Sequence, residues 1–195
     1  MTRNIALFVS GTGSNARKII EYFQDKEAVN CPLLISNKAS APALAMAEDY
    51  GLETMVLERP DFYESEDLLT VLEKYDIHLI VLAGFLWLIP PYLVAAYPRA
   101  IINIHPALLP KFGGKGMYGM HVHRAVKAAH EEESGITIHY VNERYDEGDI
   151  IFQARCQLEE SDGPELIAQR VQALEHRHFA PVIERLLSGD RSFAG

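Results

Sequence analysis

The sequence predicts an α/β protein: a single-domain, Rossmann-like, mostly parallel sheet flanked by helices. Apolar runs of strand length alternate with helical patterns along the first hundred residues, which is the order that builds a doubly wound sheet. Most of these runs are continuous, as expected for strands covered on both faces. The first run leads through a glycine-rich turn into a helical pattern, an arrangement typical of α/β proteins that bind an anion.

The strands are predicted from apolar runs bounded by turn residues. Residues 135–141 alternate apolar and polar side chains, which indicates a half-exposed strand, and residues 150–156 are expected to pair with them across a polar loop at residues 142–149. The other runs are continuous. We expect strands at residues 5–9, 33–35, 54–57, 78–82, 100–105, 135–141 and 150–156.

The helices are predicted from apolar residues at helical spacing and from proline and glycine at the helix ends. Gly51 and Gly189 each follow a helical pattern, where glycine often ends a helix. Residues 59–64 are expected to be a polar connection, and residues 106–120 a long irregular loop. Loops of that length are usually functional or disordered. We expect helices at residues 16–25, 42–50, 68–75, 90–97, 121–129 and 164–187.

Length and composition fit one globular domain over residues 1–195, with 48% hydrophobic and 23% charged residues. No apolar run approaches the roughly 20 residues that cross a bilayer, and no signal peptide is recognised, so we expect no membrane partner. The net charge of -9 argues against a nucleic-acid partner, because contact with a phosphate backbone needs a basic surface. The distant Cys31 and Cys156 are expected to be reduced thiols in a cytoplasmic protein.

The glycine-rich turn at residues 10–15 has three interpretations. A dinucleotide site would need an acidic residue at the end of the second strand, where the sequence offers only Lys38 for an NADP variant. A phosphate monoester held by Gly13, Ser14 and Asn15 fits better, since hydroxyl and amide donors add to the backbone N–H groups. A plain tight turn is the third interpretation.

Asn103 and His105 form a polar pair at the end of the strand at residues 100–105. Strand side chains alternate between faces, so the two point the same way. Pro106 ends the ladder there, at the carboxyl edge where open α/β sheets bind ligands. The alternative is an amide and an imidazole that only satisfy loop backbone.

Asp146 lies in the loop at residues 142–149. If this carboxylate lay beside His105, it would raise the histidine pKa above about 6.5 and keep the ring protonated near neutrality. A lone acid in a loop is more often a turn former, and the sequence alone does not place it next to His105. No other histidine has a zinc-binding spacing, and no Gly-x-Ser-x-Gly motif occurs, so neither a metal nor a serine hydrolase is expected.

Taken together, six segments resemble the phosphoribosylglycinamide formyltransferase family, the folate-dependent enzymes of purine biosynthesis. Each motif alone is weak, but they occur in the family's order along nearly the whole chain. The segments are SGTGSN (10–15), LAGF (82–85), NIHPALLP (103–110), GITIH (135–139), YDEG (145–148) and VQALEH (171–176).

The resemblance implies the formyltransferase fold and the transfer of a formyl group from 10-formyltetrahydrofolate to the amine of 5-phosphoribosylglycinamide, with no metal. Asn103, His105 and Asp146 match the catalytic trio. The implied roles are an oxyanion held by the Asn103 amide and a protonated His105, with Asp146 keeping His105 charged. A water beside them would shuttle the proton from the amine to the departing folate nitrogen.

The resemblance also implies two substrate sites. Residues 1–100 would form the half that binds the phosphate substrate, and residues 101–195 the folate and catalytic half. The chain departs from the family in three places. The family often has Arg where this sequence has Trp87, the loop at residues 111–118 is longer and richer in glycine than usual, and no residue matches an Arg that the family has after the third strand. The matched positions are Gly13, Ser14 and Asn15 for the phosphate, Gln172 and Glu175 for the glycinamide end, and Leu86, Trp87, Leu88, Ile89 and Asn103 for the folate.

Three rivals share part of this pattern. If the protein were a formyltetrahydrofolate deformylase, we would expect a regulatory domain before Arg3. If it were a methionyl-tRNA formyltransferase, we would expect a further C-terminal domain and a basic surface. A dinucleotide-binding protein would use the glycine turn alone. The sequence leaves open whether the protein is a monomer or a homodimer.

Overall fold

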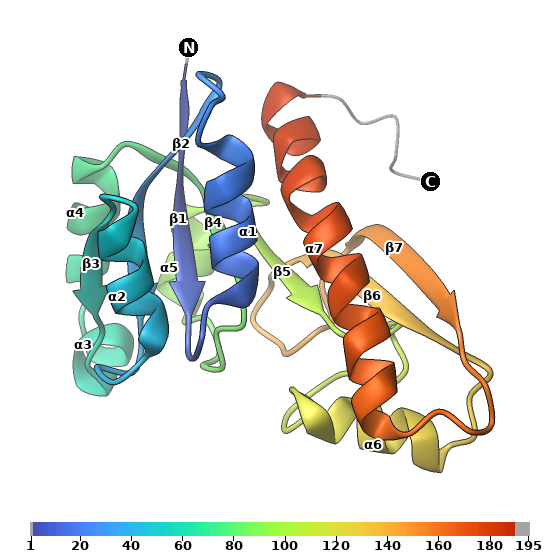
Figure 1. Cartoon of the computed structure of the whole chain (residues 1–195). Helices are drawn as coiled ribbons and strands as arrows, with labels where there is room; N and C mark the ends of the chain where they lie inside the picture. Colours follow the sequence, from blue (N-terminus) through green and yellow to red (C-terminus); the bar gives the residue numbers. More distant parts are fainter. Residues whose placement is uncertain (1, 190–195) are drawn as a thin grey trace. The chain divides into compact units, whose positions relative to one another are not determined.

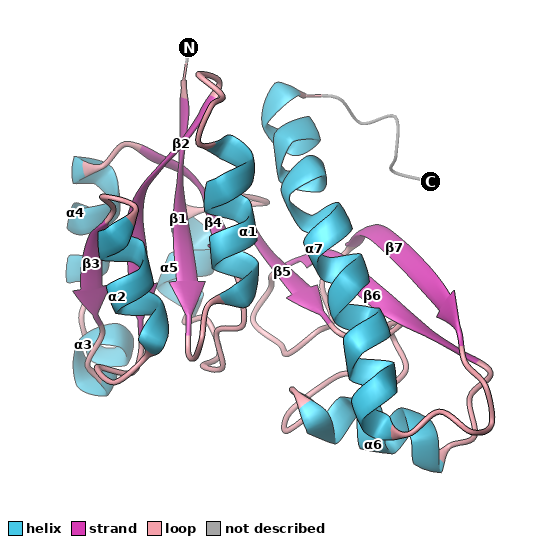
Figure 2. Cartoon of the chain, in the orientation of Figure 1, coloured by secondary structure: helices cyan, strands magenta, loops and turns pink. Residues whose placement is uncertain are grey.

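The computed structural model describes residues 2–189 and divides into two compact units, Met1–Asn103 and Ile104–Gly195. Seven strands form one sheet in the order β3-β2-β1-β4-β5-β6-β7. The described pairs β1–β2, β1–β4, β2–β3 and β4–β5 are parallel, and β6–β7 is antiparallel. The predicted fold class, a mostly parallel sheet flanked by helices, is therefore confirmed (Figure 2).

The first unit is an alternation of parallel strands and helices (Figure 1). Its central strand is buried on both faces: every side chain of Ile5–Val9 is fully inaccessible. One face of α1, which carries Ile19, Ile20 and Phe23, is buried as well. The elements are β1 (Arg3–Val9), α1 (Ser14–Phe23), β2 (Val29–Ser36), α2 (Pro42–Asp49), β3 (Glu53–Val56), α3 (Arg59–Glu64), α4 (Asp67–Lys74), β4 (Ile77–Leu82), α5 (Pro91–Ala96) and β5 (Ile101–His105, whose last two residues belong to the second unit).

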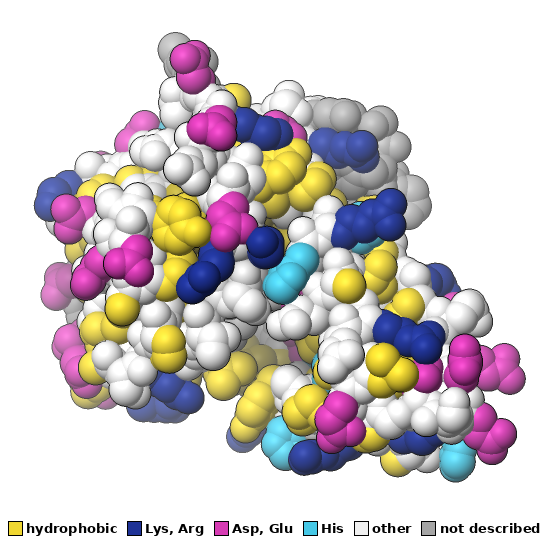
Figure 3. Space-filling view, in the orientation of Figure 1, with side chains coloured by type: hydrophobic (Ala, Val, Ile, Leu, Met, Phe, Trp, Pro, Cys, Tyr) yellow, Lys and Arg dark blue, Asp and Glu magenta, His cyan; other side chains and the backbone are white. Residues whose placement is uncertain are grey.

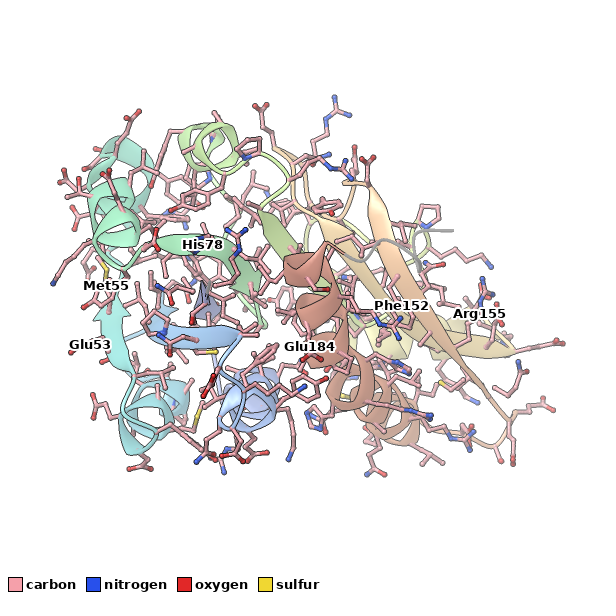
Figure 4. The ribbon with its side chains drawn as sticks, turned by 90° about the horizontal axis from the view of Figure 1, so that it is seen from above. Glu53, Met55, His78, Phe152, Arg155 and Glu184 are labelled. Atoms are coloured by element: carbon pink, nitrogen blue, oxygen red, sulfur yellow. The ribbon has the colours of Figure 1, made fainter. Side chains whose placement is uncertain are left out.

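The second unit is built on an antiparallel hairpin. Strands β6 (Glu133–Tyr140) and β7 (Ile150–Gln157) pair from Glu133 opposite Gln157 to His139 opposite Ile150. Helix α6 (Met120–Ala128) packs on α7 (Pro164–Ser188), which also packs on the hairpin (Figure 2). Figure 4 labels Phe152 and Arg155 on β7; the exposed Arg155 side chain forms an ion pair with Glu133.

Most predicted elements occur close to their expected bounds, with three differences. The prediction that residues 135–141 form a half-exposed strand was wrong, because Thr137 and His139 on its polar face are as buried as the isoleucines. Residues 59–64 are helix α3, so the prediction of a polar connection was wrong. A helix of six residues is too short to show helical periodicity in the sequence, yet Phe62 at its centre is fully buried. Strand β2 begins at Val29, four residues before the predicted start. Asn30 is exposed there, and Pro32 interrupts the apolar run.

The surface in Figure 3 mixes acidic and basic side chains on the visible face. Over residues 2–189, no helix is both long enough and apolar enough to cross a membrane.

Candidate active site

The polar pair predicted at the strand end lies on β5. Ile102 and Ile104 are buried, Asn103 is half-buried, and His105 is 3% exposed. Alternation along the strand puts Asn103 and His105 on one side of β5. The imidazole is therefore a buried ionisable group at the carboxyl end of a parallel strand.

The structure brings Asp146 to His105, which the sequence alone did not establish. Oδ2 of Asp146 lies 3.4 Å from Nδ1 of His105, and the two side chains are 10% and 4% exposed. Asp146 has a left-handed backbone with φ 58°, rare for a residue other than glycine. The loop between β6 and β7 thus turns this carboxylate inward, where water screens its charge little.

A backbone carbonyl fixes the tautomer of His105. Nε2 lies 2.8 Å from the carbonyl oxygen of Phe112. A carbonyl only accepts, so Nε2–H must donate to it. In the neutral ring the remaining atom, Nδ1, then carries a lone pair and faces Asp146. Nδ1 is therefore the atom at which His105 gains and loses a proton.

The glycine-rich loop that supplies this carbonyl also holds the carboxylate. The backbone N–H of Gly114 donates to Oδ2 of Asp146 at 2.9 Å. A Cβ on Gly113 would lie 2.6 Å from Leu109 Cδ2 and 3.3 Å from Asp146 Cβ, so a side chain there would push against both residues. The loop at residues 112–114 thus contacts both members of the pair.

Two further histidines belong to this cluster. His139 on β6 is 2% exposed, and its Nε2 lies 3.5 Å from Asp146 Oδ1. His123 on α6 is 5% exposed, and its Nδ1 is buried without a hydrogen-bond partner among the described residues. One sequence feature pointed to His139: with Thr137 it forms the polar face of an alternating strand.

Burial lowers the pKa of His105, and the charge of His139 lowers it further. The carboxylate of Asp146 and the Phe112 carbonyl act in the opposite direction but do not outweigh burial. The prediction that His105 has a raised pKa and stays protonated near neutrality was therefore wrong. The sign of the Asp146 effect was right, but the cost of removing the imidazolium from water is larger.

The pKa of Asp146 is lowered. Burial alone would raise it, but three kinds of neighbour together outweigh burial: hydrogen bonding by His139, the charge of His105 and the N–H of Gly114. Asp146 is thus an ionised carboxylate between two imidazoles. Among residues 2–189, no group of three or more His, Cys, Asp or Glu side chains could hold a metal ion.

The predicted phosphate turn begins helix α1 in the first unit. Gly13 has φ 72°, and a Cβ there would lie 2.6 Å from Ala43 Cβ. Ser14 and Asn15 are the first two helical residues, and the first turn contains no acidic side chain. Backbone N–H groups at such a helix start favour an anion. The end of β2 is Ser36-Asn37-Lys38, with the Ser36 hydroxyl hydrogen-bonded to the backbone of Lys38. None of these three side chains is a carboxylate that could bind a ribose.

The segment after β4 forms an apolar surface beside that turn. The Leu86 N–H donates to the Ser10 hydroxyl at 2.9 Å, which ties the two segments together. Leu86 is 38% exposed, whereas Ile89 is buried. Trp87 and Leu88 are half-buried.

Trp87 is held from one side by α3. Its ring centroid lies 5.6 Å from that of Phe62 and 6.0 Å from that of Tyr63. The guanidinium carbon of Arg59 lies 5.5 Å from the Trp87 ring. These α3 residues were missed because their segment was expected to be a loop.

The two residues matched to the glycinamide end lie on α7. Gln172 is exposed and Glu175 is half-buried, three residues apart and so on one side of the helix. Their role toward a substrate remains a prediction.

The fold and this cluster define a class of protein. The chain belongs to the formyl transferase family, whose model matches residues 3–183.

Within the family, several of its relatives carry the same name. The chain is 44% identical over 188 residues to phosphoribosylglycinamide formyltransferase, chloroplastic, of Arabidopsis thaliana, covering 93% of this chain and 64% of that protein. It therefore spans less than two thirds of the plant relative's length. It is 36% identical over 191 residues to phosphoribosylglycinamide formyltransferase of Bacillus subtilis, covering 95% of each. The solved structure of the phosphoribosylglycinamide formyltransferase of Coxiella burnetii has a TM-score of 0.87 at 35% identity, covering 97% of this chain and 89% of that one.

Proposed function

We propose that this protein transfers the formyl group of 10-formyltetrahydrofolate to the amine of 5-phosphoribosylglycinamide, a step of de novo purine biosynthesis. The products are formylglycinamide ribonucleotide and tetrahydrofolate. The observation that carries the proposal is the buried pair of His105 and Asp146, 3.4 Å apart, in a chain whose relatives are named for this reaction.

The reaction needs a proton to move between two nitrogens. The amine nitrogen bonds to the formyl carbon, an oxyanion forms, and the bond from that carbon to the folate nitrogen then breaks. The amine loses a proton and the folate nitrogen gains one. A neutral His105 is suited to this relay, because Phe112 occupies Nε2 and leaves Nδ1 to take the proton.

Asp146 stabilises the charge that this relay creates. When Nδ1 takes the proton, an imidazolium forms beside an ionised carboxylate, and the attraction offsets part of the cost of a buried charge. The Asn103 amide, on the same side of β5, donates to the oxyanion. Removing one such donor costs roughly 10²–10³ in rate.

The remaining residues bind the substrates in this proposal. Gly13, Ser14 and Asn15 hold the substrate phosphate at the start of α1. Residues 86–89 bind the folate ring together with Asn103. The glycinamide end is placed near Gln172 and Glu175.

The proposal includes a cytoplasmic setting and a monomer or homodimer acting on small molecules. The described cysteines are free thiols, as a reducing compartment requires. Burial raises the pKa of Cys31 to about 12, which makes it an unreactive core residue.

The decisive experiment follows folate product release by absorbance, with and without phosphoribosylglycinamide. We expect release only when the amine is present and loss of release in His105→Ala. Release without the amine would favour the alternative of a deformylase, and no release in either case would leave a binding protein. Tight binding of NADPH in a fluorescence titration would favour the dinucleotide-binding alternative.

A further inference from the structure

We propose that His139 is a positioning residue for the His105–Asp146 pair, holding the second carboxylate oxygen of Asp146 and sharing that charge between two imidazoles. The inference rests on the proposed function for what the pair does. It adds a third residue, on a different strand, that contacts no reacting atom.

The geometry assigns each carboxylate oxygen its own partners. Oδ2 faces Nδ1 of His105 and accepts from the Gly114 N–H. Oδ1 faces Nε2 of His139 at 3.5 Å. The carboxylate is therefore held from both sides, and its rotation about the Cβ–Cγ bond is restricted.

His139 is itself rigidly placed. Its Nδ1–H donates to the carbonyl of Tyr140 at 2.8 Å, which directs Nε2 at Asp146. A Cβ on Gly148 would lie 1.7 Å from that carbonyl oxygen, so the returning loop packs directly against the group that fixes the ring. The chain of contacts runs from Gly148 through Tyr140 and His139 to Asp146.

The carboxylate needs such a support because its backbone is in an unusual conformation. Asp146 adopts φ 58° within the loop between β6 and β7, a conformation that is uncommon outside glycine, and the contacts of its side chain help to hold it there. Gly114 supplies one contact through its N–H, and that loop is glycine-rich. The imidazole of His139 comes from a strand, which positions a side chain more precisely than a loop does.

In this proposal His139 is a protonated ring, because both of its partners, the Tyr140 carbonyl and Asp146 Oδ1, only accept. A neutral ring with Nδ1–H would turn the Nε2 lone pair toward Oδ1, whereas a protonated ring donates to it. Three ionisable groups surround His105: Asp146 from the loop at residues 142–149, His139 from β6, and His123 from α6. Asp146 raises the pKa of His105, and a positive His139 lowers it. Removing that positive charge leaves more of the carboxylate's attraction to His105.

Two variants separate the positioning of Asp146 by His139 from the effect of the His139 charge on His105. His139→Gln keeps an N–H donor in reach of Oδ1 but carries no charge, and His139→Phe removes both. In the ligand-free protein, NMR titration of the His105 ring, assigned by its loss in His105→Ala, should move to higher pH in His139→Gln, which loses only the charge. The shift should be smaller in His139→Phe, where Asp146 is also released from its second partner. The acid limb of kcat/KM should move the same way. We expect kcat to fall about ten- to a hundred-fold in His139→Phe, as for a lost charge-assisted hydrogen bond, and clearly less in His139→Gln, with KM little changed in either.

The exposed His130 gives a matched control. His130→Asn removes a histidine at φ 52°, a conformation that asparagine tolerates, and should leave both readouts unchanged. If His139→Phe fails to fold, as judged by thermal melting, His139→Gln decides alone through the titration.

A histidine that only fills space would reduce stability without moving the titration of His105. An unmoved titration in His139→Gln with wild-type kcat would overturn the proposal. The titration needs no substrate, so it stands apart from the proposed reaction. A wild-type chain inactive with phosphoribosylglycinamide would refute that reaction and leave the titration result intact.

Discussion

Replacing Asp146 by Asn tests the centre of the proposed mechanism. The substitution keeps the size of the side chain and an oxygen that can accept from the Gly114 N–H, but it removes the negative charge 3.4 Å from Nδ1 of His105. We expect the fold to survive, turnover to fall steeply, and substrate affinity to change little.

The size of the loss follows from the distance. At 3.4 Å and an effective dielectric constant of about 20, two unit charges attract by roughly 5 kcal/mol. The net value is smaller, because His139 and the Gly114 N–H already share the carboxylate's charge. A hydrogen bond to a charged group is worth about 1.5–3 kcal/mol. Since roughly 1.4 kcal/mol is tenfold in rate, we expect kcat to fall by about one to two orders of magnitude.

The pH dependence of kcat/KM tests the direction in which Asp146 shifts the pKa of His105. Because Asp146 raises the pKa of His105, Asp146→Asn should lower that pKa further. If neutral His105 is the active form, kcat/KM rises with pH through this pKa, and the limb moves to lower pH in the variant. The exposed Asp149, in the same loop, is the matched control, and Asp149→Asn should change neither kcat nor the limb.

A wild-type kcat in Asp146→Asn, or a limb that moves to higher pH, would refute the assignment of Asp146 as the charge partner of His105. Circular dichroism of both variants would exclude unfolding as the cause of any loss.

Three other substitutions test the remaining parts of the site. Asn103→Ala should keep KM for both substrates and lower kcat by roughly 10²–10³; an unchanged kcat in steady-state assays would remove Asn103 from the mechanism. Gly13→Ala places a Cβ 2.6 Å from Ala43 Cβ at φ 72°, so thermal melting should show a stability loss of about 1–3 kcal/mol and KM for the phosphorylated substrate should rise. Trp87→Ala should raise KM for the folate several-fold while kcat stays near wild type, and an equal rise in KM for the phosphorylated substrate would show that the residue supports the fold instead.

Local sequence patterns predicted the framework of the fold well. The strand of Ile5–Val9, the glycine turn and the start of α1 follow from apolar run length and from the left-handed conformation that Gly13 adopts. Helix α3 was missed because only six residues and one buried side chain, Phe62, distinguish it from a polar loop. Because α3 was missed, the packing of its residues around Trp87 was missed as well.

The contacts that hold His105 and Asp146 were much harder to predict. Phe112 and Gly114 make their contacts through a backbone carbonyl and a backbone N–H. Nearly every residue type has these groups, so the sequence does not reveal such contacts. Side-chain identity at Gly113 is informative only once the loop is known to pack on Asp146. His139 was visible only as one polar residue in an alternating strand.

The direction of the His105 pKa could not be predicted from the sequence for a related reason. A neighbouring carboxylate can be guessed from a motif, but the cost of desolvation depends on how completely the surrounding elements exclude water. His105 is 3% exposed, so burial outweighs Asp146.

This correction changes the mechanism in a definite way. A permanently protonated His105 could donate to an oxyanion but could not accept the proton that the amine must lose. A His105 whose ring is neutral at rest, with Nε2–H fixed by Phe112 and Nδ1 beside an ionised Asp146, can do both in sequence. In the proposed mechanism, Nδ1 accepts the proton on attack, and the resulting imidazolium donates to the developing charge and then to the leaving nitrogen. Burial keeps the base free, and Asp146 limits the cost of charging it.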